Sequence, residues 1–182
     1  MALSGDGNTL AVGAYDEDSD ATGINGDQAN EFGVETGAVY VFVRDAMDQW
    51  SQQAYVKASN TDIRQYFGWS VALSDAGDTL VVGAHREGSN ATGINGNQVN
   101  VFGADTGAAY VFVRDAMDQW SQQAYVKASN TGSGDGFGYS VALSGDASIL
   151  VAGAASEDGN AAGIGGNQAN DSAIGAGAVY VY

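Results

Sequence analysis

The chain has 182 residues, of which 22 are acidic and 6 are basic, so its formal net charge is −16. Because phosphates and anionic lipids are bound by basic patches, this charge argues against a nucleic-acid partner and against docking on membrane surfaces. Cysteine is absent and histidine occurs once, which excludes disulfides, thiolate metal sites and multi-histidine metal centres.

Neither a membrane span nor a signal peptide is expected in this segment. No apolar run reaches the roughly 18 residues that a spanning helix needs, so we predict no membrane insertion. The residues from Met1 to Gly7 hold neither a basic region nor an apolar run, unlike an export signal. Two alternatives follow: a cytosolic protein, or one whose export signal is not part of this chain.

The chain is built from a repeat of 70 residues. Ala2-Leu3-Ser4 recurs at 72–74 and at 142–144, and residues 40–61 are identical to residues 110–131. We therefore divide the chain into about two and a half copies of one unit. The first copy is expected to lack its first strand, the second to be complete, and the third to lack its fourth strand. The three copies span residues 1–61, 62–131 and 132–182.

The complete copy begins with two predicted strands. Large and small residues alternate over 67–73, which is the period of a β-strand whose two faces meet different neighbours. A turn at 75–78 is indicated by aspartate and glycine. The run over 79–84 is continuously apolar, so the second strand is predicted to be buried on both faces.

Two more strands follow a loop of about twenty residues at 87–106, a length typical of functional or disordered loops. The third strand is expected over 109–113 and the fourth over 120–127. No helix is predicted, because the stretch 45–53 has no apolar stripe at helical spacing. The unit is therefore four strands.

Repeated four-stranded units rich in glycine and aromatic residues are typical of β-propeller blades. The predicted fold is all-β, a partial propeller of about two and a half four-stranded antiparallel blades. A blade cannot bury its faces alone, and ten strands fall short of three full blades. We therefore expect a fragment of a longer ring, or an open array that self-associates through its incomplete terminal blades.

The unit resembles the FG-GAP repeat, which builds the β-propeller of integrin α subunits and occurs in bacterial surface proteins. The residues that carry the resemblance are Phe67-Gly68 followed by Val82-Gly83-Ala84, Phe137-Gly138 followed by Ala152-Gly153-Ala154, and Val12-Gly13-Ala14. The proline after the family's Gly-Ala is replaced by Tyr15, His85 and Ala155. The family's calcium loop is shortened here to 4–8, 74–78 and 144–148, each with one or two carboxylates, whereas calcium takes about six to eight oxygens.

A better candidate for calcium begins the long loop of the first copy. Asp16, Asp18 and Asp20 alternate, with Glu17 among them, and Asp27 falls twelfth when Asp16 is counted first. This spacing matches the EF-hand loop, and carboxylates are the ligands that calcium prefers. The alternative is a solvated acidic loop, because Ala21 stands where an EF-hand needs glycine.

A glutamate recurs at the same place in every copy, as Glu17, Glu87 and Glu157. A position kept through duplication indicates a shared role. Capping a turn or pairing with a backbone amide is favoured over ligating a metal.

The long loop recurs in all copies and is our candidate for binding a protein or glycan ligand. Its Asn-Gly pairs predict a tight turn, and Ile24, Ile94 and Ile164 are positioned to pin that turn onto each blade. If the blades stack side by side, the loops emerge on one face. The candidate ligand-binding residues are Asn25, Gln28, Asn95, Gln98, Asn167 and Gln168.

Aromatic residues on the third and fourth strands are interpreted as packing between blades rather than as a sugar platform. They are Tyr40, Tyr110, Tyr180, Trp50 and Trp120. No enzyme activity is expected, because His85 has no histidine equivalent in the other copies. Ser70 and Ser140 also lack the last glycine of a nucleophile elbow.

The sequence therefore predicts a non-catalytic, FG-GAP-type propeller segment for extracellular adhesion or ligand binding, with calcium as its candidate cofactor. The resemblance implies an extracellular or cell-surface location. Two alternatives stay open: a purely structural repeat scaffold or assembly module, and an accessory propeller of a larger surface enzyme.

Overall fold

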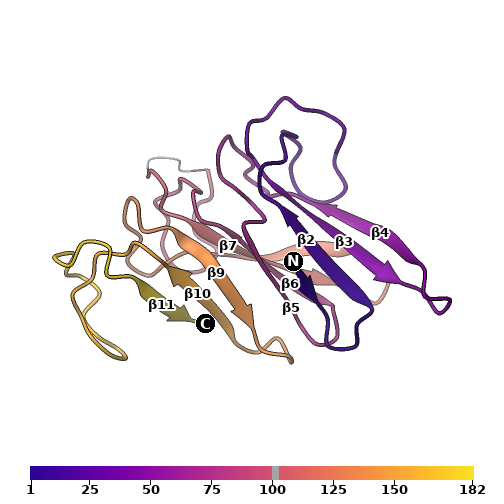
Figure 1. Ribbon diagram of the computed structural model, residues 1–182. Coiled ribbons are helices and arrows are strands. Elements are labelled where there is room, and N and C mark those ends of the chain that lie inside the picture. Colours follow the sequence, from indigo (N-terminus) through magenta and orange to yellow (C-terminus); the bar gives the residue numbers. More distant parts are fainter. Residues whose placement is uncertain (100–102) are drawn as a thin grey trace.

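The computed structural model describes residues 1–99 and 103–182, so part of the predicted loop at 87–106 lies outside the described residues. Within these ranges the chain forms eleven strands and no helix, so none is present that is long and apolar enough to cross a membrane. The strands form three antiparallel sheets (Figure 1). In the first sheet they are β1 (Ala2–Leu3), β2 (Thr9–Ala14), β3 (Ala38–Arg44) and β4 (Trp50–Val56).

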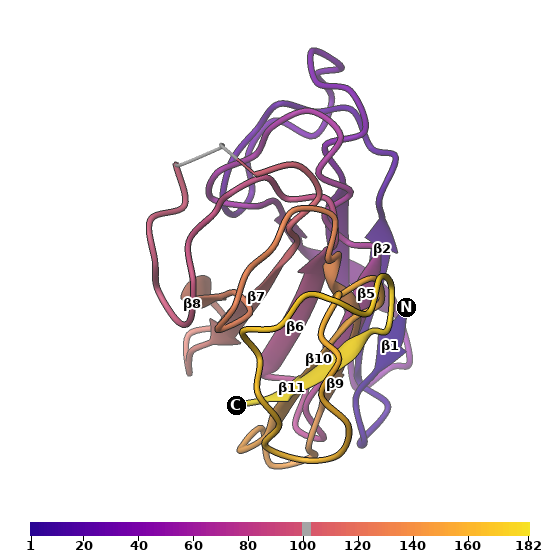
Figure 2. The same ribbon diagram turned by 90° about the vertical axis from the view of Figure 1, so that its left-hand side faces the viewer.

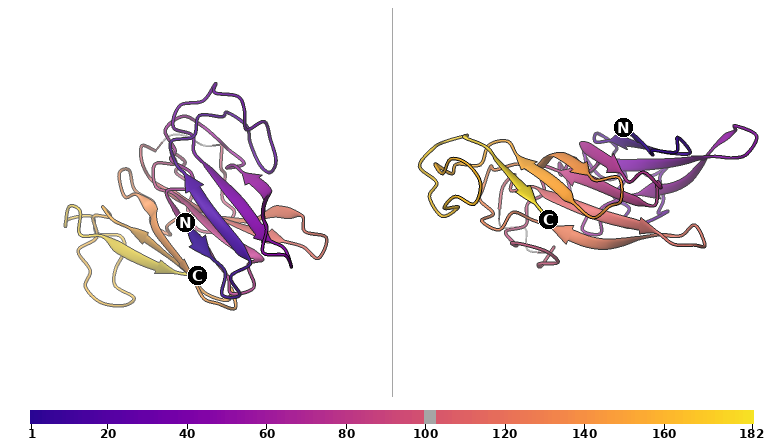
Figure 3. Two further views of the ribbon diagram at one scale, coloured as in Figure 1. Left: turned by 45° about the vertical axis from the view of Figure 1, so that its right-hand side comes forward. Right: turned by 90° about the horizontal axis from the view of Figure 1, so that it is seen from below.

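The other two sheets repeat this order. The second consists of β5 (Ser70–Leu73), β6 (Thr79–Ala84), β7 (Ala108–Arg114) and β8 (Trp120–Val126). The third consists of β9 (Phe137–Leu143), β10 (Leu150–Ala154) and β11 (Ala178–Val181). In each sheet the strands are paired in chain order, which is the meander of a propeller blade. The sheets stack in a fan (Figure 3), so the fold is a partial, open β-propeller.

Two strand predictions differ from the structure. The first copy was expected to have no first strand, but Ala2 and Leu3 pair with Ala11 and Leu10 as a short β1. In the second sheet, β5 begins at Ser70 rather than at Phe67. Phe67 instead forms a parallel bridge to Gly37 of the first sheet, so this part of the predicted strand joins two sheets.

The core lies between the sheets. Phe67 is fully buried and meets the rings of Tyr110 and Phe112 edge to face. Trp120 is 7% exposed and its indole N–H donates to Oε1 of Gln53 in the first sheet, at 2.9 Å. Trp50, the equivalent residue of the first sheet, is 44% exposed. Stacking of one sheet on another is therefore what buries these aromatic residues.

Glycine permits the sheets to approach closely. A Cβ atom on Gly83 would lie 2.0 Å from the carbonyl oxygen of Gly138, and one on Gly13 would lie 2.0 Å from that of Gly68. A Cβ on Gly107 would lie 2.1 Å from the carbonyl oxygen of Phe137. These separations are shorter than any real contact, so the glycines are required by neighbouring backbone.

We predict that Gly107→Ala destabilises the fold more than Gly177→Ala. Both positions have positive φ, 80° and 77°, so the backbone strain is matched. At Gly177 the nearest atom to an added Cβ is the Ala155 oxygen at 3.3 Å. We expect an excess cost of about 1–3 kcal/mol for Gly107→Ala, as for other overpacking substitutions, measured by urea unfolding. Equal costs would contradict the close approach.

Candidate functional site on the loop face

The long connections leave the sheets at one end. Because neighbouring strands are antiparallel, the end of β2, the start of β3, the end of β4 and the start of β5 lie at the same edge. We call this edge of the stack the loop face. The long connections of the first two sheets rise together there (Figure 2). The recurring glutamate and most predicted binding residues lie on it.

A buried ion pair fixes the long loop in the first sheet. Lys57 follows β4, and its Nζ lies 2.8 Å from Oε2 of Glu17. The same ammonium group donates to the carbonyl oxygen of Ser19 and to the hydroxyl of Thr36. The hydroxyl of Tyr55 donates to the other oxygen of Glu17. The lysine therefore ties both ends of the loop to the sheet.

The second sheet repeats the pair with more complete burial. Nζ of Lys127 lies 2.9 Å from Oε2 of Glu87, and both side chains are fully buried. Nζ also donates to the hydroxyl of Thr106. Burial lowers the pKa of Lys127 and its glutamate opposes that shift. The geometry of a 2.9 Å contact with additional hydrogen bonds fits a charged pair. The glutamate thus has a structural role in these two sheets, but its partner is a lysine rather than the turn cap or backbone amide that the sequence favoured.

A second device joins each sheet to the next, and we call it the Ser-Asn clasp (Ser59-Asn60 and Ser129-Asn130). Asn60 follows β4, and its Nδ2 donates to Oε1 of Glu87 and to the carbonyl oxygen of Gln98 in the second sheet. The Tyr110 hydroxyl donates to Oδ1 of Asn60 at 2.6 Å. Asn130 makes the same three contacts with Glu157, Gln168 and Tyr180 of the third sheet.

The predicted ligand-binding residues take part mainly in these internal contacts. Oδ1 of Asn25 accepts from the amide of Tyr55, and Asn95 does the same with Tyr125. The Oε1 atoms of Gln98 and Gln168 accept hydrogen bonds from the serines of the clasp. Gln28 contacts Gln52, and Asn167 accepts from the amide of Ala169. The structure therefore gives five of these residues contacts that link the loop to a strand or to the preceding sheet, whereas the contact of Asn167 lies within its own turn.

The predicted calcium ligands do not converge. Glu17 belongs to the ion pair, Oδ1 of Asp18 accepts from the amide of Glu35, and Oδ1 of Asp27 accepts from the amide of Ala29. Asp16 and Asp20 are exposed. Among the described residues, no three acidic or histidine side chains are grouped to hold a metal. This donor set does not fit a calcium ion as it stands.

An aromatic cluster on the loop face was not anticipated from the sequence. We define it as Tyr15, Tyr66, Trp69, His85 and Tyr139. The ring of Trp69 lies 4.8 Å from that of Tyr15 and 4.5 Å from that of His85, and Tyr139 lies 5.3 Å from His85. Tyr15 belongs to the first sheet and Tyr139 to the third, so the cluster exists only when the sheets stack.

Charged groups border the aromatic cluster. The guanidinium of Arg86 lies 4.9 Å over the ring of Tyr66, within the range of a cation–π contact. Desolvation is the main reason that the pKa of His85 is lowered, and Arg86 adds to it. Nδ1 of His85 has no hydrogen-bond partner in the described chain. The cluster thus offers ring faces, a neutral imidazole and one cation.

The fold and the loop face define the class of protein: an all-β propeller module built from repeats, in which the Ser-Asn clasp joins each sheet to the next. A sequence model of the FG-GAP repeat matches residues 50–112 and 120–182, well over half of the chain, so the chain belongs to the FG-GAP repeat family. Each match starts with a fourth strand, and the two matches end within β7 and one residue after β11, the third strands of the following sheets. None of the curated proteins compared with the chain matches it.

We predict that Lys127→Met destabilises the fold by about 3–5 kcal/mol, because it leaves a buried carboxylate without its cation. Lys57→Met is the matched variant, and we expect a smaller cost since Glu17 is partly solvated and keeps the Tyr55 hydroxyl. Adding Glu87→Gln to Lys127→Met should recover part of the loss. Urea unfolding measures all three. A cost for Lys127→Met near that of an exposed pair, below about 1 kcal/mol, would contradict this account.

Proposed function

We propose that the chain is a non-catalytic ligand-binding module of an extracellular or cell-surface adhesion protein. FG-GAP repeats are generally associated with ligand-binding or adhesion propellers, typically in extracellular or surface proteins. The ligand, a protein or a glycan, binds at the aromatic cluster of the loop face.

The observation that carries this proposal is the exposure of the aromatic cluster. Tyr15 and Tyr139 are 40% and 46% exposed, and Trp69 between them is partly exposed. Tyrosine, tryptophan and arginine are the residues most often responsible for binding energy at interfaces. The cluster combines residues from three copies of the repeat. Its composition can therefore vary among FG-GAP proteins even where the repeats themselves are nearly identical. Such a position suits recognition better than the loop amides, which make internal hydrogen bonds.

We predict that Trp69→Ala and Tyr139→Ala each weaken ligand binding about 30-fold or more, the effect of losing a hot spot of about 2 kcal/mol. Screening against a glycan array and against surface-protein extracts identifies the ligand, and titration gives the affinities. Trp50→Ala is the control, because Trp50 is an exposed tryptophan at the opposite end of its sheet. Binding unchanged by both cluster variants in folded protein would refute the site.

A structural scaffold is the second candidate function, favoured by the Ser-Asn clasp and by the identity of residues 40–61 and 110–131. A scaffold needs no ligand, and its surfaces need not diversify. Concentration-dependent association by sedimentation, together with no ligand for the aromatic cluster, would favour it. The third candidate, an accessory propeller of a larger surface enzyme, derives from the family resemblance.

Calcium assistance, which the sequence predicted, is tested separately by melting the protein in calcium, in magnesium and in chelator. Because the loop carboxylates make internal hydrogen bonds, we expect both ions to shift the melting temperature equally, by screening the charge of −16. When the calcium concentration is about a hundredfold the Kd of a site, binding adds about 2.7 kcal/mol to the free energy of unfolding. A calcium-specific shift of that size, abolished by Asp18→Asn, would restore the predicted calcium loop.

A further inference from the structure

The outer strand of the third sheet is uncovered in the described structure. Val179 and Val181 of β11 are 70% and 67% exposed. Their equivalents in the first sheet, Val39 and Val41 of β3, are fully buried. Two differences accompany this exposure. Val39 and Val41 pack in one apolar cluster with residues of the second sheet, and β3 is also paired with β4. In the described chain β11 pairs only with β10, and no further sheet packs on its outer face.

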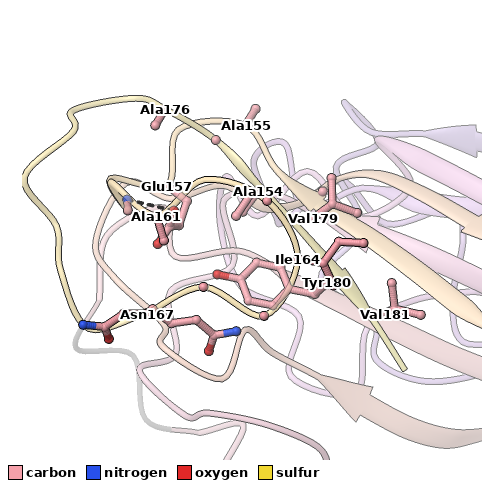
Figure 4. Close-up of a pocket in the computed structure, with 18 of the residues that line it drawn as sticks. Ala154, Ala155, Glu157, Ala161, Ile164, Asn167, Ala176, Val179, Tyr180 and Val181 are labelled. Carbon is pink, nitrogen blue, oxygen red and sulfur yellow. Dashed lines mark hydrogen bonds between the residues drawn. The ribbon is translucent and has the colours of Figure 1, made fainter.

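A groove runs along this edge. Its volume is about 810 Å³, and its lining includes Glu157, Ile164 and the residues of β11. Figure 4 shows Glu157 and Tyr180 on its walls beside the loop that carries Asn167. Ile164 is fully exposed, although Ile24 and Ile94 form bridges to Val56 and Val126 of their fourth strands. The groove therefore has the place, and the unused contacts, of a fourth strand.

Glu157 is buried on the wall of this groove without the cation that its equivalents have. It is 4% exposed, and its oxygens accept only from Asn130 and from the amide of Gly159, both at 2.8 Å, among the described residues. Nearby, burial raises the pKa of Asp135, and the charges of Glu157 and Asp158 add to the rise. The third sheet therefore has excess negative charge at the position equivalent to the Glu87–Lys127 pair of the second sheet.

The two four-stranded sheets show which residues occupy the position that corresponds to this groove. Each fourth strand has the sequence Trp-Ser-Gln-Gln-Ala-Tyr-Val and is followed by a lysine. Its tyrosine ring lies 5.3 Å or 5.2 Å from the tyrosine of the third strand. Its lysine meets the loop glutamate. In the third sheet both partners, Tyr180 and Glu157, are present. Each matched FG-GAP repeat begins with such a segment, at Trp50 and at Trp120.

We propose that the groove along β11 is an acceptor site for the fourth-strand segment of a further FG-GAP repeat, whose lysine pairs with Glu157. The segment adds as an antiparallel strand, so main-chain hydrogen bonds hold it and the lysine sets its register. A second copy of this chain is not the source, because both of its own segments are paired and their lysines are fully buried. The groove shares Tyr139 with the aromatic cluster, but the proposal does not rest on ligand binding there.

The test uses a labelled peptide with the sequence of residues 120–131 and the full chain. We expect saturable binding by fluorescence anisotropy, with amide exchange slowed in β11. A peptide with methionine in place of its lysine should bind at least tenfold more weakly, and a scrambled peptide should not bind. Because the protein is unchanged in these comparisons, misfolding cannot explain the result. Trp69→Ala should leave peptide binding intact, which separates this site from the aromatic cluster.

A second measurement adds the segment in cis. Appending the sequence of residues 113–131 after Tyr182 should raise the melting temperature and abolish binding of the peptide. The proposal would be overturned if the peptide did not bind and the appended segment did not raise the melting temperature. Equal binding of the methionine peptide would overturn the pairing with Glu157. Dimers of the unextended chain that the peptide dissociates would overturn the assigned source in favour of a second copy.

Discussion

The close approach of one sheet to the next is the constraint on which the rest of the structure depends. At Gly37 and Gly107 the backbone of the preceding sheet meets the backbone of Phe67 and Phe137 directly. A side chain at either glycine would separate the sheets. The same contact buries each phenylalanine against the aromatic residues of its own third strand. Gly13 and Gly83 of the Gly-Ala elements approach the carbonyl oxygens of Gly68 and Gly138 just as closely. The Phe-Gly and Gly-Ala elements of the repeat therefore meet in one packing requirement.

The buried lysine–glutamate pairs carry this order out to the loop face. An isolated charge in such a position is costly, and each pair is retained with further hydrogen bonds to both ends of the long loop. A long loop that begins and ends on one ammonium group has little freedom where it leaves the sheet. This explains how residues that flank the loop, such as Tyr15 and His85, are held against rings from the neighbouring sheet.

The sequence predicted the elements that repeat and missed what arises between copies. The 70-residue period and the apolar run at 79–84 located β6 correctly, but β1 has only two residues and shows no period. Gln98 was chosen as a candidate from the recurring loop, and nothing in the sequence indicated its hydrogen bond from Ser59 of the preceding copy. The aromatic cluster draws on three copies. Tyr15 and His85 occupy one repeat position and Trp69 and Tyr139 another, but the residue types differ between copies. The available signal was the ring at these positions, after the Gly-Ala pairs and after the two Phe-Gly pairs.

The clasp gives the stack a direction. Each fourth strand is followed by a lysine that pairs with the glutamate of its own sheet. The serine and asparagine just beyond it bind the glutamine and glutamate of the next sheet. In the third sheet, Asn130 has already engaged Glu157 from one side. A fourth strand there would supply the lysine from the other side and, with the same segment, a new clasp facing outward. The lysine that completes one sheet and the clasp that binds the next lie within a few residues of each other. Pairing of one strand therefore brings both groups into place together.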